Sequence, residues 1–439
     1  MGPMSRHGIC ALALWLAACA APQAPGPADR DISREPLAPN DGWAAADSGT
    51  WGGADAKPEH VFEARNRAEL VAALALGKAG GAASNSPKIV RIAGTIDLSV
   101  DDANRPLGYD DYRDPAFDFA AYLTAYDPAA WGRKPPEGPL EAARVRSAQR
   151  QAARVIVRVP SNTTLLGVGR DARIVHGMLL LEKVDNVIVR NIAFEDAYDH
   201  FPAWDPKDNA GGEWNSQYDN VSLRGASNVW IDHCTFGDGD RPDHAARTAL
   251  GRPMQHHDGL LDITHQSNHV TVSWNHFRDH DKTSLVGSSD SAKADDGKLK
   301  ITFHHNLWER TKERAPRVRY GEVHVYNNLY VASTTPPAAH GYSIGVGLAS
   351  RVFSEHNAWE TPPALPGTAL VRLWKGNAFF DRGSLQNGRP VDLLAALRQA
   401  HPDAAISADV GWQPRLHLPV DAAADVARKV REGAGAGRL

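Results

Sequence analysis

A short segment recurs six times between residues 186 and 360, and this repeat limits the folds open to the chain. Each copy begins with valine or isoleucine, alternates in polarity and reaches an aromatic residue seven positions later. The six pairs are Val187/Phe194, Val229/Phe236, Val270/Phe277, Ile301/Trp308, Val323/Tyr330 and Val352/Trp359. One such strand cannot bury its apolar side alone, whereas stacked copies bury a continuous core and pair in parallel. The repeat therefore predicts an all-β fold, a parallel β-helix in which each copy belongs to one turn of a solenoid.

The spacing of the copies argues against the other all-β architecture that we considered, a β-sandwich. Sandwich strands recur about every 8 to 12 residues, but these copies lie 22 to 42 residues apart. Four copies carry asparagine two residues before the aromatic, namely Asn275, Asn306, Asn328 and Asn357. We expect these side chains to stack as an amide ladder at a bend, each bonded to the backbone of the next turn. Cys234 has the same register in an earlier copy, so we expect it to be buried and unreactive.

The regions on either side of the repeat have other patterns. Residues 64–79 have an amphipathic helical pattern and would form a capping helix over the first turn of the solenoid. Residues 391–399 and 422–432 also have helical patterns and would cover the other end or a side. Residues 100–150 are rich in Asp, Tyr and Pro and are predicted to be loops. Because every predicted helix and loop would pack against the same coil, we predict a single domain over residues 41–439.

The first 40 residues have the features of an export signal and a linker. Residues 1–18 carry one arginine and an apolar run too short to span a bilayer, which is typical of a signal peptide. The run ends in LAAC, which resembles the lipobox of bacterial lipoproteins and predicts lipidation of Cys19. Residues 19–40 are rich in Ala, Pro and Gly and would form a flexible tether. We therefore expect a protein lipid-anchored to the bacterial cell envelope, or a secreted one if an ordinary signal peptidase cuts near Ala18 or Ala21.

Charge and cysteine content exclude several classes of protein. The chain has 48 Lys and Arg against 52 Asp and Glu, and a net charge of −4 gives no bulk reason to bind nucleic acid. Three cysteines, two of them in or beside the leader, exclude a disulfide scaffold. No later stretch has 18 uninterrupted apolar residues, so we expect membrane contact only through the lipid anchor. We also expect a monomer.

Three aspartates are candidates for a cation site. Asp219 begins the strand of the second repeat, and Asp258 and Asp262 precede the strand of the third. A spacing of four places the last two on one face of a strand or helix. Three carboxylates suit a hard cation such as Ca²⁺, although water or substrate would have to complete its six to eight oxygens. On composition alone, solvated aspartates at strand ends are the favoured interpretation.

Three basic residues follow the aspartates along the coil. Lys282 lies in the segment DHDKTS, and Arg314 and Arg319 lie in ERAPRVRYG, just before the fifth repeat. Arginine at such a place suits the recognition of carboxylates or phosphates. A salt-bridged surface patch is the alternative that the residues alone leave open.

These residues in this order resemble the calcium-dependent pectate lyases of polysaccharide lyase family 1. The match runs from about residue 42 to the end and is densest in VPSNTTLLGVG, EDAYDHFPAWDP, WNSQYDNVSLRGASNVWIDHCTF, DHDKTSLVGSSDS, KLKITFHHN and RAPRVRYGEVHVYNN. The resemblance implies a right-handed parallel β-helix, which agrees with the repeat. It also implies a reaction, endo-type cleavage of α-1,4-linked polygalacturonate by Ca²⁺-dependent β-elimination, which gives 4,5-unsaturated oligogalacturonates.

The resemblance assigns a role to each candidate. Asp219, Asp258 and Asp262 match the primary calcium ligands of the family, Lys282 and Arg319 match residues that bind substrate carboxylates, and Arg314 matches the proposed catalytic base. Asp232 and His233 match a signature that we interpret as mainly structural. Arginine is normally protonated, so a base role requires partial deprotonation of Arg314, and we expect activity to rise into alkaline pH.

Three other functions compete with this interpretation. A pectin lyase would act on methyl-esterified chains without calcium, and the aspartate triad would then be unnecessary. A glycoside hydrolase could use Asp258 and Asp262 as its carboxylate pair, but Lys282, Arg314 and Arg319 would then lack a role. A non-catalytic, lipid-anchored polysaccharide-binding protein would not need any of these six residues, yet all are present.

Overall fold

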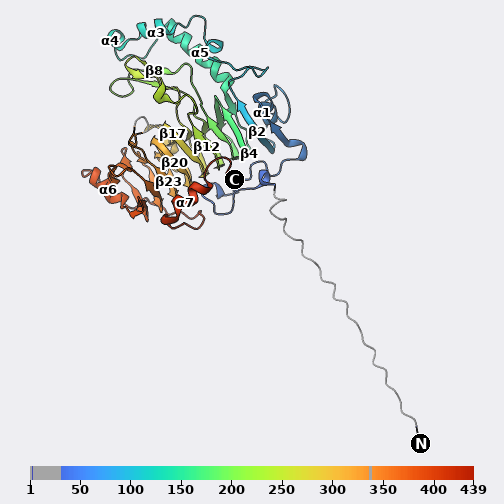
Figure 1. The fold of residues 1–439 in the computed structure, drawn as a ribbon, viewed down its shortest axis with the longest axis vertical. Helices are drawn as coiled ribbons and strands as arrows, with labels where there is room; N and C mark the ends of the chain where they lie inside the picture. The colour runs from blue at the N-terminus through green and yellow to red at the C-terminus, as the bar shows by residue number, and fades with distance from the viewer. Residues whose placement is uncertain (1, 3–30, 336–338) are drawn as a thin grey trace. The chain divides into compact units, whose positions relative to one another are not determined.

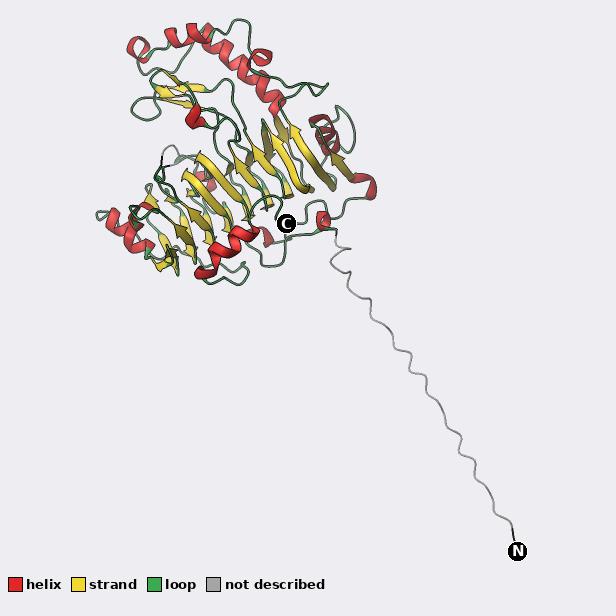
Figure 2. Cartoon of the chain, in the orientation of Figure 1, coloured by secondary structure: helices red, strands yellow, loops and turns green. Residues whose placement is uncertain are grey.

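Three short strands form each turn of the body, and each strand pairs in parallel with its equivalent in the next turn (Figures 1 and 2). One turn consists of β10 (Val221–Arg224), β11 (Ser227–Asp232) and β12 (Thr235–Gly237), and the next of β15 (Leu261–Thr264), β16 (Asn268–Ser273) and β17 (His276–Lys282). The predicted right-handed parallel β-helix is confirmed.

Further strands extend the coil in both directions. Earlier strands are β1 (Val61–Ala64), β2 (Lys88–Asp97), β3 (Ile156–Arg158), β4 (Thr163–Val175), β5 (Met178–Glu182), β6 (Asp185–Arg190) and β7 (Ala193–Glu195). Later strands are β18 (Leu285–Val286), β19 (Lys300–His304), β20 (Leu307–Glu313), β21 (Arg317–Val318), β22 (Glu322–Tyr326), β23 (Leu329–Val331), β24 (Ile344–Val346), β25 (Arg351–Glu355), β26 (Ala358–Glu360), β27 (Val371–Leu373), β28 (Phe379–Arg382) and β29 (Leu385–Gln386). One sheet of eight strands runs β3-β5-β10-β15-β18-β21-β24-β27, and the other strands named here belong to a larger sheet.

The computed structural model describes residue 2, residues 31–335 and residues 339–439. Most of the predicted leader, including the lipidation residue Cys19, lies outside the described residues. The compact unit begins at Ser33 and not at residue 41 as predicted. The difference arises because Leu37 is buried and its N–H donates to the carbonyl of Thr50 at 3.0 Å. No helix among the described residues is long and apolar enough to cross a membrane.

The predicted amide ladder runs through the bend between two strands of each turn. The backbone N–H groups of Cys234, Asn275, Asn306 and Asn328 each donate to the Oδ1 of the asparagine one turn later, at 2.8–3.0 Å. Each Nδ2 donates back to a backbone carbonyl of the preceding turn. Burial raises the pKa of the Cys234 thiol to about 12, so this cysteine is unreactive as predicted.

The repeated aromatic residues form a second ladder inside the coil. From Phe194 to Trp359, successive rings stack with centroids 4.2–6.1 Å apart and planes within 6–12° of parallel. Rings in this offset-stacked range attract one another beyond the gain from burial. The repeat therefore sets both the apolar core and the register of the turns.

Helices cover the ends and one side of the coil. The capping helix α1 (Arg67–Leu74) packs on β1 and β2, and the Asn66 side chain accepts a hydrogen bond from the Glu69 N–H at its start. The two predicted C-terminal helices are α6 (Leu393–Ala400) and α7 (Ala423–Gly433). Val426 and Val430 of α7 pack on the outside of the coil. All three helical predictions are confirmed.

The prediction that residues 100–150 are loops is wrong. They contain α2 (Tyr109–Tyr112), α3 (Phe119–Ala125), α4 (Pro128–Trp131) and most of α5 (Pro139–Val155), and Figure 1 shows α3, α4 and α5 near β8 (Ala203–Asp205). Aspartates that suggested loops are N-caps, because Asp118 and Asp127 accept hydrogen bonds from backbone N–H groups in the first turns of α3 and α4.

Two chain ends run along the outside of the turns. Near the N-terminus, the N–H groups of Ala44 and Gly53 donate to threonine hydroxyls of β16 and β4, at 3.0 and 2.8 Å. Near the C-terminus, the N–H groups of Ala436 and Gly437 donate to side chains of Thr235 and Asn191, at 3.0 and 2.7 Å. Both segments bond to several turns and act as straps.

A buried carboxyl in the last turns makes stability depend on pH. Burial raises the pKa of Asp381 in β28 to about 7, although Ser354 and Ser384 donate hydrogen bonds to it. The folded pKa exceeds the unfolded value of about 3.9, so the stabilisation is present below pH 4 and lost as pH rises through 7. Asp381→Asn should therefore raise the melting temperature by several degrees at pH 8, corresponding to about 2–4 kcal/mol.

The same variant should give no such gain at pH 4, where the wild-type carboxyl is already neutral. Asp403→Asn at an exposed site is the matched control and should have no effect at either pH. An equal gain for Asp381→Asn at both pH values would rule out this explanation.

Candidate active site

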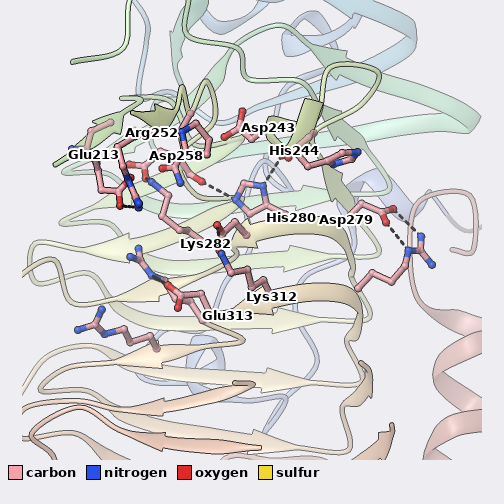
Figure 3. A pocket seen from close by; sticks show the side chains of 18 of the residues that line it. Glu213, Asp243, His244, Arg252, Asp258, Asp279, His280, Lys282, Lys312 and Glu313 are labelled. Carbon is pink, nitrogen blue, oxygen red and sulfur yellow. Dashed lines mark hydrogen bonds and ion pairs between the residues drawn. The ribbon is translucent and has the colours of Figure 1, made fainter. Parts of the chain in front are cut away.

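A cleft of about 1030 Å³ lies over the side of the coil and is lined mainly by charged side chains (Figure 3). Strands β17 and β20 contribute residues 279–282 and Arg310, Lys312 and Glu313 to its lining. Other lining residues come from the segments 208–215 and 243–258, from Arg317 of β21 and from Trp374, which follows β27. The cleft contains three of the predicted site residues: Asp258, Lys282 and Arg314.

The other two predicted aspartates lie next to Asp258 but do not line the cleft. Asp219 lies two residues before β10, Asp262 lies in β15, and these two strands are hydrogen-bonded neighbours. Gly259 lies between the two carboxylates. A Cβ at this position would be 2.5 Å from Asp262 Oδ1 and 2.9 Å from Asp219 Oδ1, so only glycine leaves the carboxylates in place.

Burial and mutual repulsion disfavour charge on these aspartates. Burial and the charge of Asp258 raise the pKa of Asp219 to about 6. Burial, followed by the charges of Asp219 and Asp258, raises the pKa of Asp262 well above its usual range. A bound cation stabilises the charged form of three carboxylates that lie close together. Carboxylate oxygens suit a hard cation such as Ca²⁺. Among the described residues, no group of three or more His, Cys, Asp or Glu side chains forms a ready-made metal cage.

Lys282 forms an ion pair with one of the three aspartates. Its Nζ donates to Asp258 Oδ1 at 2.9 Å, and both residues are labelled in Figure 3. Burial lowers the pKa of the Lys282 ammonium, but the charge and hydrogen bond of Asp258 together with the charge of Asp281 outweigh burial, and the pKa lies above its ordinary value. Lys282 is therefore positively charged in the cleft.

Arg314 follows β20 in a left-handed backbone conformation, with φ of 62°. Its Nε donates to Glu313 Oε1 at 3.2 Å, and Glu313 lies beside Lys282 in the strand register. Burial lowers the pKa of the guanidinium, but the charges of Glu313 and Asp262 outweigh burial, so the pKa lies above its ordinary value. Arg314 is therefore protonated as long as these carboxylates keep their negative charges.

Arg319, like Asp219 and Asp262, does not line the cleft. Its Nε donates to Asp290 Oδ1 at 2.7 Å and its Nη1 to the Gly287 carbonyl at 3.0 Å. Asp290 also accepts a hydrogen bond from Lys375. These bonds hold the guanidinium against the segment that follows β18.

Comparison with known proteins identifies the family. A family model described as "Pectate lyase" matches residues 139–410. A pectate lyase of Bacillus subtilis is 46% identical over 93% of this chain and 94% of its own. The chain belongs to the pectate lyase family.

Solved structures agree with this membership. The thermostable pectate lyase PL 47 has a TM-score of 0.91 at 45% identity, and the match covers 93% of this chain and all of that one. A pectate lyase bound to a hexasaccharide has a TM-score of 0.88 at 46% identity, with the same coverage. The resemblance found in the sequence is confirmed.

The ion pairs around the predicted residues of this pectate lyase cleft were not predicted from the sequence. Arg310 pairs with Asp279 at 2.6 Å and Lys312 with Asp281 at 2.9 Å, so β17 and β20 form a row of opposite charges. The alternating charges in RDHDK and ERTKE were the available signal.

The buried His280 was also missed. Its Nδ1 lies 2.6 Å from Asp238 Oδ1 and its Nε2 lies 2.7 Å from the carbonyl of Asp258, so it fixes the backbone that carries this aspartate. By contrast, Asp232 and His233 do not line the cleft and form a partly buried hydrogen-bonded pair, at 2.7 Å, in agreement with a structural role.

Proposed function

We propose that this protein cleaves polygalacturonate by β-elimination and releases 4,5-unsaturated oligogalacturonates in an endo fashion. The observation that carries the proposal is that Asp258, Lys282 and Arg314 meet in one cleft of a pectate lyase fold. The hexasaccharide-bound relative supports an oligosaccharide substrate for this cleft.

The reaction explains why basic side chains line the cleft. Loss of the C5 proton, which lies α to the uronate carboxylate, places negative charge on that carboxylate. The electron pair then forms the C4–C5 double bond, and the C4–O4 bond breaks with protonation of the leaving oxygen. Lys282 would bind the uronate carboxylate and stabilise the charge where it develops. Arg319 would act in the same way after exchanging Asp290 for the substrate carboxylate.

Asp219, Asp258 and Asp262 would hold the Ca²⁺ ion. When bound, the ion would supply positive charge that offsets the negative charge developing on the uronate carboxylate. The pKa values of Asp219 and Asp262, raised by burial and by the charges of neighbouring aspartates, support a cation at this place. With the ion bound, these two aspartates would remain charged at neutral pH.

Arg314 would accept the C5 proton. A cation at Asp262 and Asp258 would offset two of the charges that raise the guanidinium pKa, while the larger contribution of Glu313 remains, so burial would favour the neutral form more strongly than in the free protein. Arg314→Ala should reduce the formation of unsaturated product at least 1,000-fold, with binding of polygalacturonate retained. Ultraviolet absorbance of the unsaturated uronide at alkaline pH measures this, and Arg158→Ala at a surface ion pair is the control.

The same assay separates the competing functions. Absorbance that grows with a chelator present and only on methyl-esterified chains indicates a pectin lyase. New reducing ends without absorbance indicate hydrolysis, which would contradict the elimination mechanism. Binding of polygalacturonate with neither signal indicates a non-catalytic binding protein.

Gly259→Ala tests the cation site without changing a ligand. The added Cβ would displace the carboxylates of Asp219 and Asp262, so Ca²⁺ affinity measured by calorimetry should fall at least tenfold. Gly108→Ala is the matched control, because a Cβ at Gly108 meets nothing within 4 Å. Unchanged Ca²⁺ binding by Gly259→Ala would place the ion elsewhere.

We also propose that Cys19 is lipidated and anchors the protein to the cell envelope. The proposal rests on the LAAC segment at the end of the apolar leader. Cys19→Ser should move the protein from the membrane fraction to the soluble exported fraction, as measured by fractionation and immunoblotting. Equal membrane recovery of both forms would argue for another means of retention.

A further inference from the structure

Almost every lysine and arginine side chain that lines the cleft already forms an ion pair with a carboxylate of the chain. The pairs are Lys282–Asp258, Arg310–Asp279, Lys312–Asp281, Arg314–Glu313 and Arg252–Glu213. Arg317 differs from these arginines and lysines, because no described carboxylate lies within 4.0 Å of its guanidinium. Its Nε is buried and has no hydrogen-bond partner among the described residues. An unsatisfied, partly buried guanidinium is well suited to bind an anion from outside the chain.

Arg317 forms one side of an arginine–tryptophan–arginine stack. Its Cζ lies 4.6 Å from the centroid of the Trp374 ring, and the Cζ of Arg372 lies 4.7 Å from the same ring. Arg372 is exposed and, like Arg317, has no ion-pair partner among the described residues. The stack therefore carries two positive charges that the chain does not neutralise. Stacking on the indole also fixes both guanidinium planes before a ligand arrives.

The strand register explains how the stack is built. Arg317 of β21 pairs with Gly345 of β24, and Gly345 pairs with Arg372 of β27. The two arginines therefore lie two strands apart on the same face of the eight-stranded sheet, with Gly345 on the strand between them. A Cβ at Gly345 would lie 3.0 Å from Arg317 Cγ and 2.9 Å from the ring of Tyr342, so glycine leaves room for the arginine side chain.

The same register places the stack in line with the cation site. Ile263 pairs with Val286 and Val286 with Val318, so the residues that precede them share one face: Asp262, Leu285 and Arg317. At about 4.8 Å per rung, Arg317 lies roughly 10 Å and Arg372 roughly 19 Å from Asp262 along the coil. A small acid bound at the cation site cannot reach that far, whereas an extended polyanion can.

We propose that Arg317 and Arg372, held by Trp374, form an outlying subsite that binds carboxylates of the polyuronate chain several sugar units from the bond that is cleaved. This subsite rests on the proposed function and sets the chain length at which the enzyme binds best. Burial and the charge of Arg319 lower the pKa of Arg317, in keeping with a site that lacks a negative charge. Each guanidinium can present two parallel N–H groups to one carboxylate.

The test compares a long and a short substrate. For Arg372→Gln, KM for polygalacturonate should rise about tenfold while kcat stays within about twofold, because a remote contact made equally in ground and transition states is lost. Kinetics on trigalacturonate, which is too short to reach from the cation site to Arg372, should not change. Arg372→Lys keeps the charge without the planar fork and should give an intermediate KM.

Arg389→Gln, which removes an exposed arginine near the end of the coil, is the matched control and should not change either substrate. Trp374→Leu removes the stacking surface and should raise KM for the polymer in the same way as Arg372→Gln. Equal effects of Arg372→Gln on both substrates, or none on the polymer, would overturn the subsite.

Failure of the proposed function has a different signature. If the wild-type protein makes no unsaturated product, the affinity of wild type and Arg372→Gln for polygalacturonate is compared by calorimetry. Weaker binding by the variant would retain the subsite and reject the reaction, whereas equal binding would reject the subsite as well.

Discussion

The hydrogen bonding between equivalent strands of successive turns is the interaction on which the rest of the structure depends. The asparagine ladder satisfies backbone N–H and carbonyl groups at a bend where strand pairing stops, and these groups are fully buried. The stacked aromatic rings fill the core beside it. Because the register is fixed at every turn, a residue's place along one strand determines its neighbours on the next.

The active-site geometry follows from this fixed register. Lys282 and Glu313 are opposite each other in β17 and β20, and Arg314 comes one residue later. Asp219 and Asp262 come together because β10 and β15 are neighbours. Residues that are far apart in the sequence therefore meet without a dedicated binding loop. Their charges largely compensate one another in the free protein, so a polyuronate must exchange partners with internal carboxylates when it binds.

The sequence predicted the features that have a local pattern. The apolar and aromatic positions recur at fixed spacing, and the coil, its amide ladder and its covering helices follow from them. The helices around α5 were missed, because Asp118 and Asp127 were interpreted as loop residues although they begin helices. Composition cannot separate a capping aspartate from a turn aspartate unless the helical period that follows is also considered.

The arrangement of the site residues was only partly predictable. The resemblance selected Asp258, Lys282 and Arg314, which share the cleft, but it did not reveal that Arg319 pairs with Asp290. Strands β18 and β21 have two residues each, too few to show any period. The partners of Arg317 and Arg319 depend on the register of these strands, which only the folded coil determines.

The two straps alter how the coil can come apart. In a simple solenoid each turn contacts only its neighbours, so an end can open while the middle stays folded. Here the segment near Ala44 and Gly53 bonds to both β16 and β4, and the C-terminal segment bonds to Thr235 and Asn191. Opening one terminal turn therefore also breaks contacts to turns further along. The straps join a linear array of weak units into one cooperative body, so its cleft persists as long as the whole coil does.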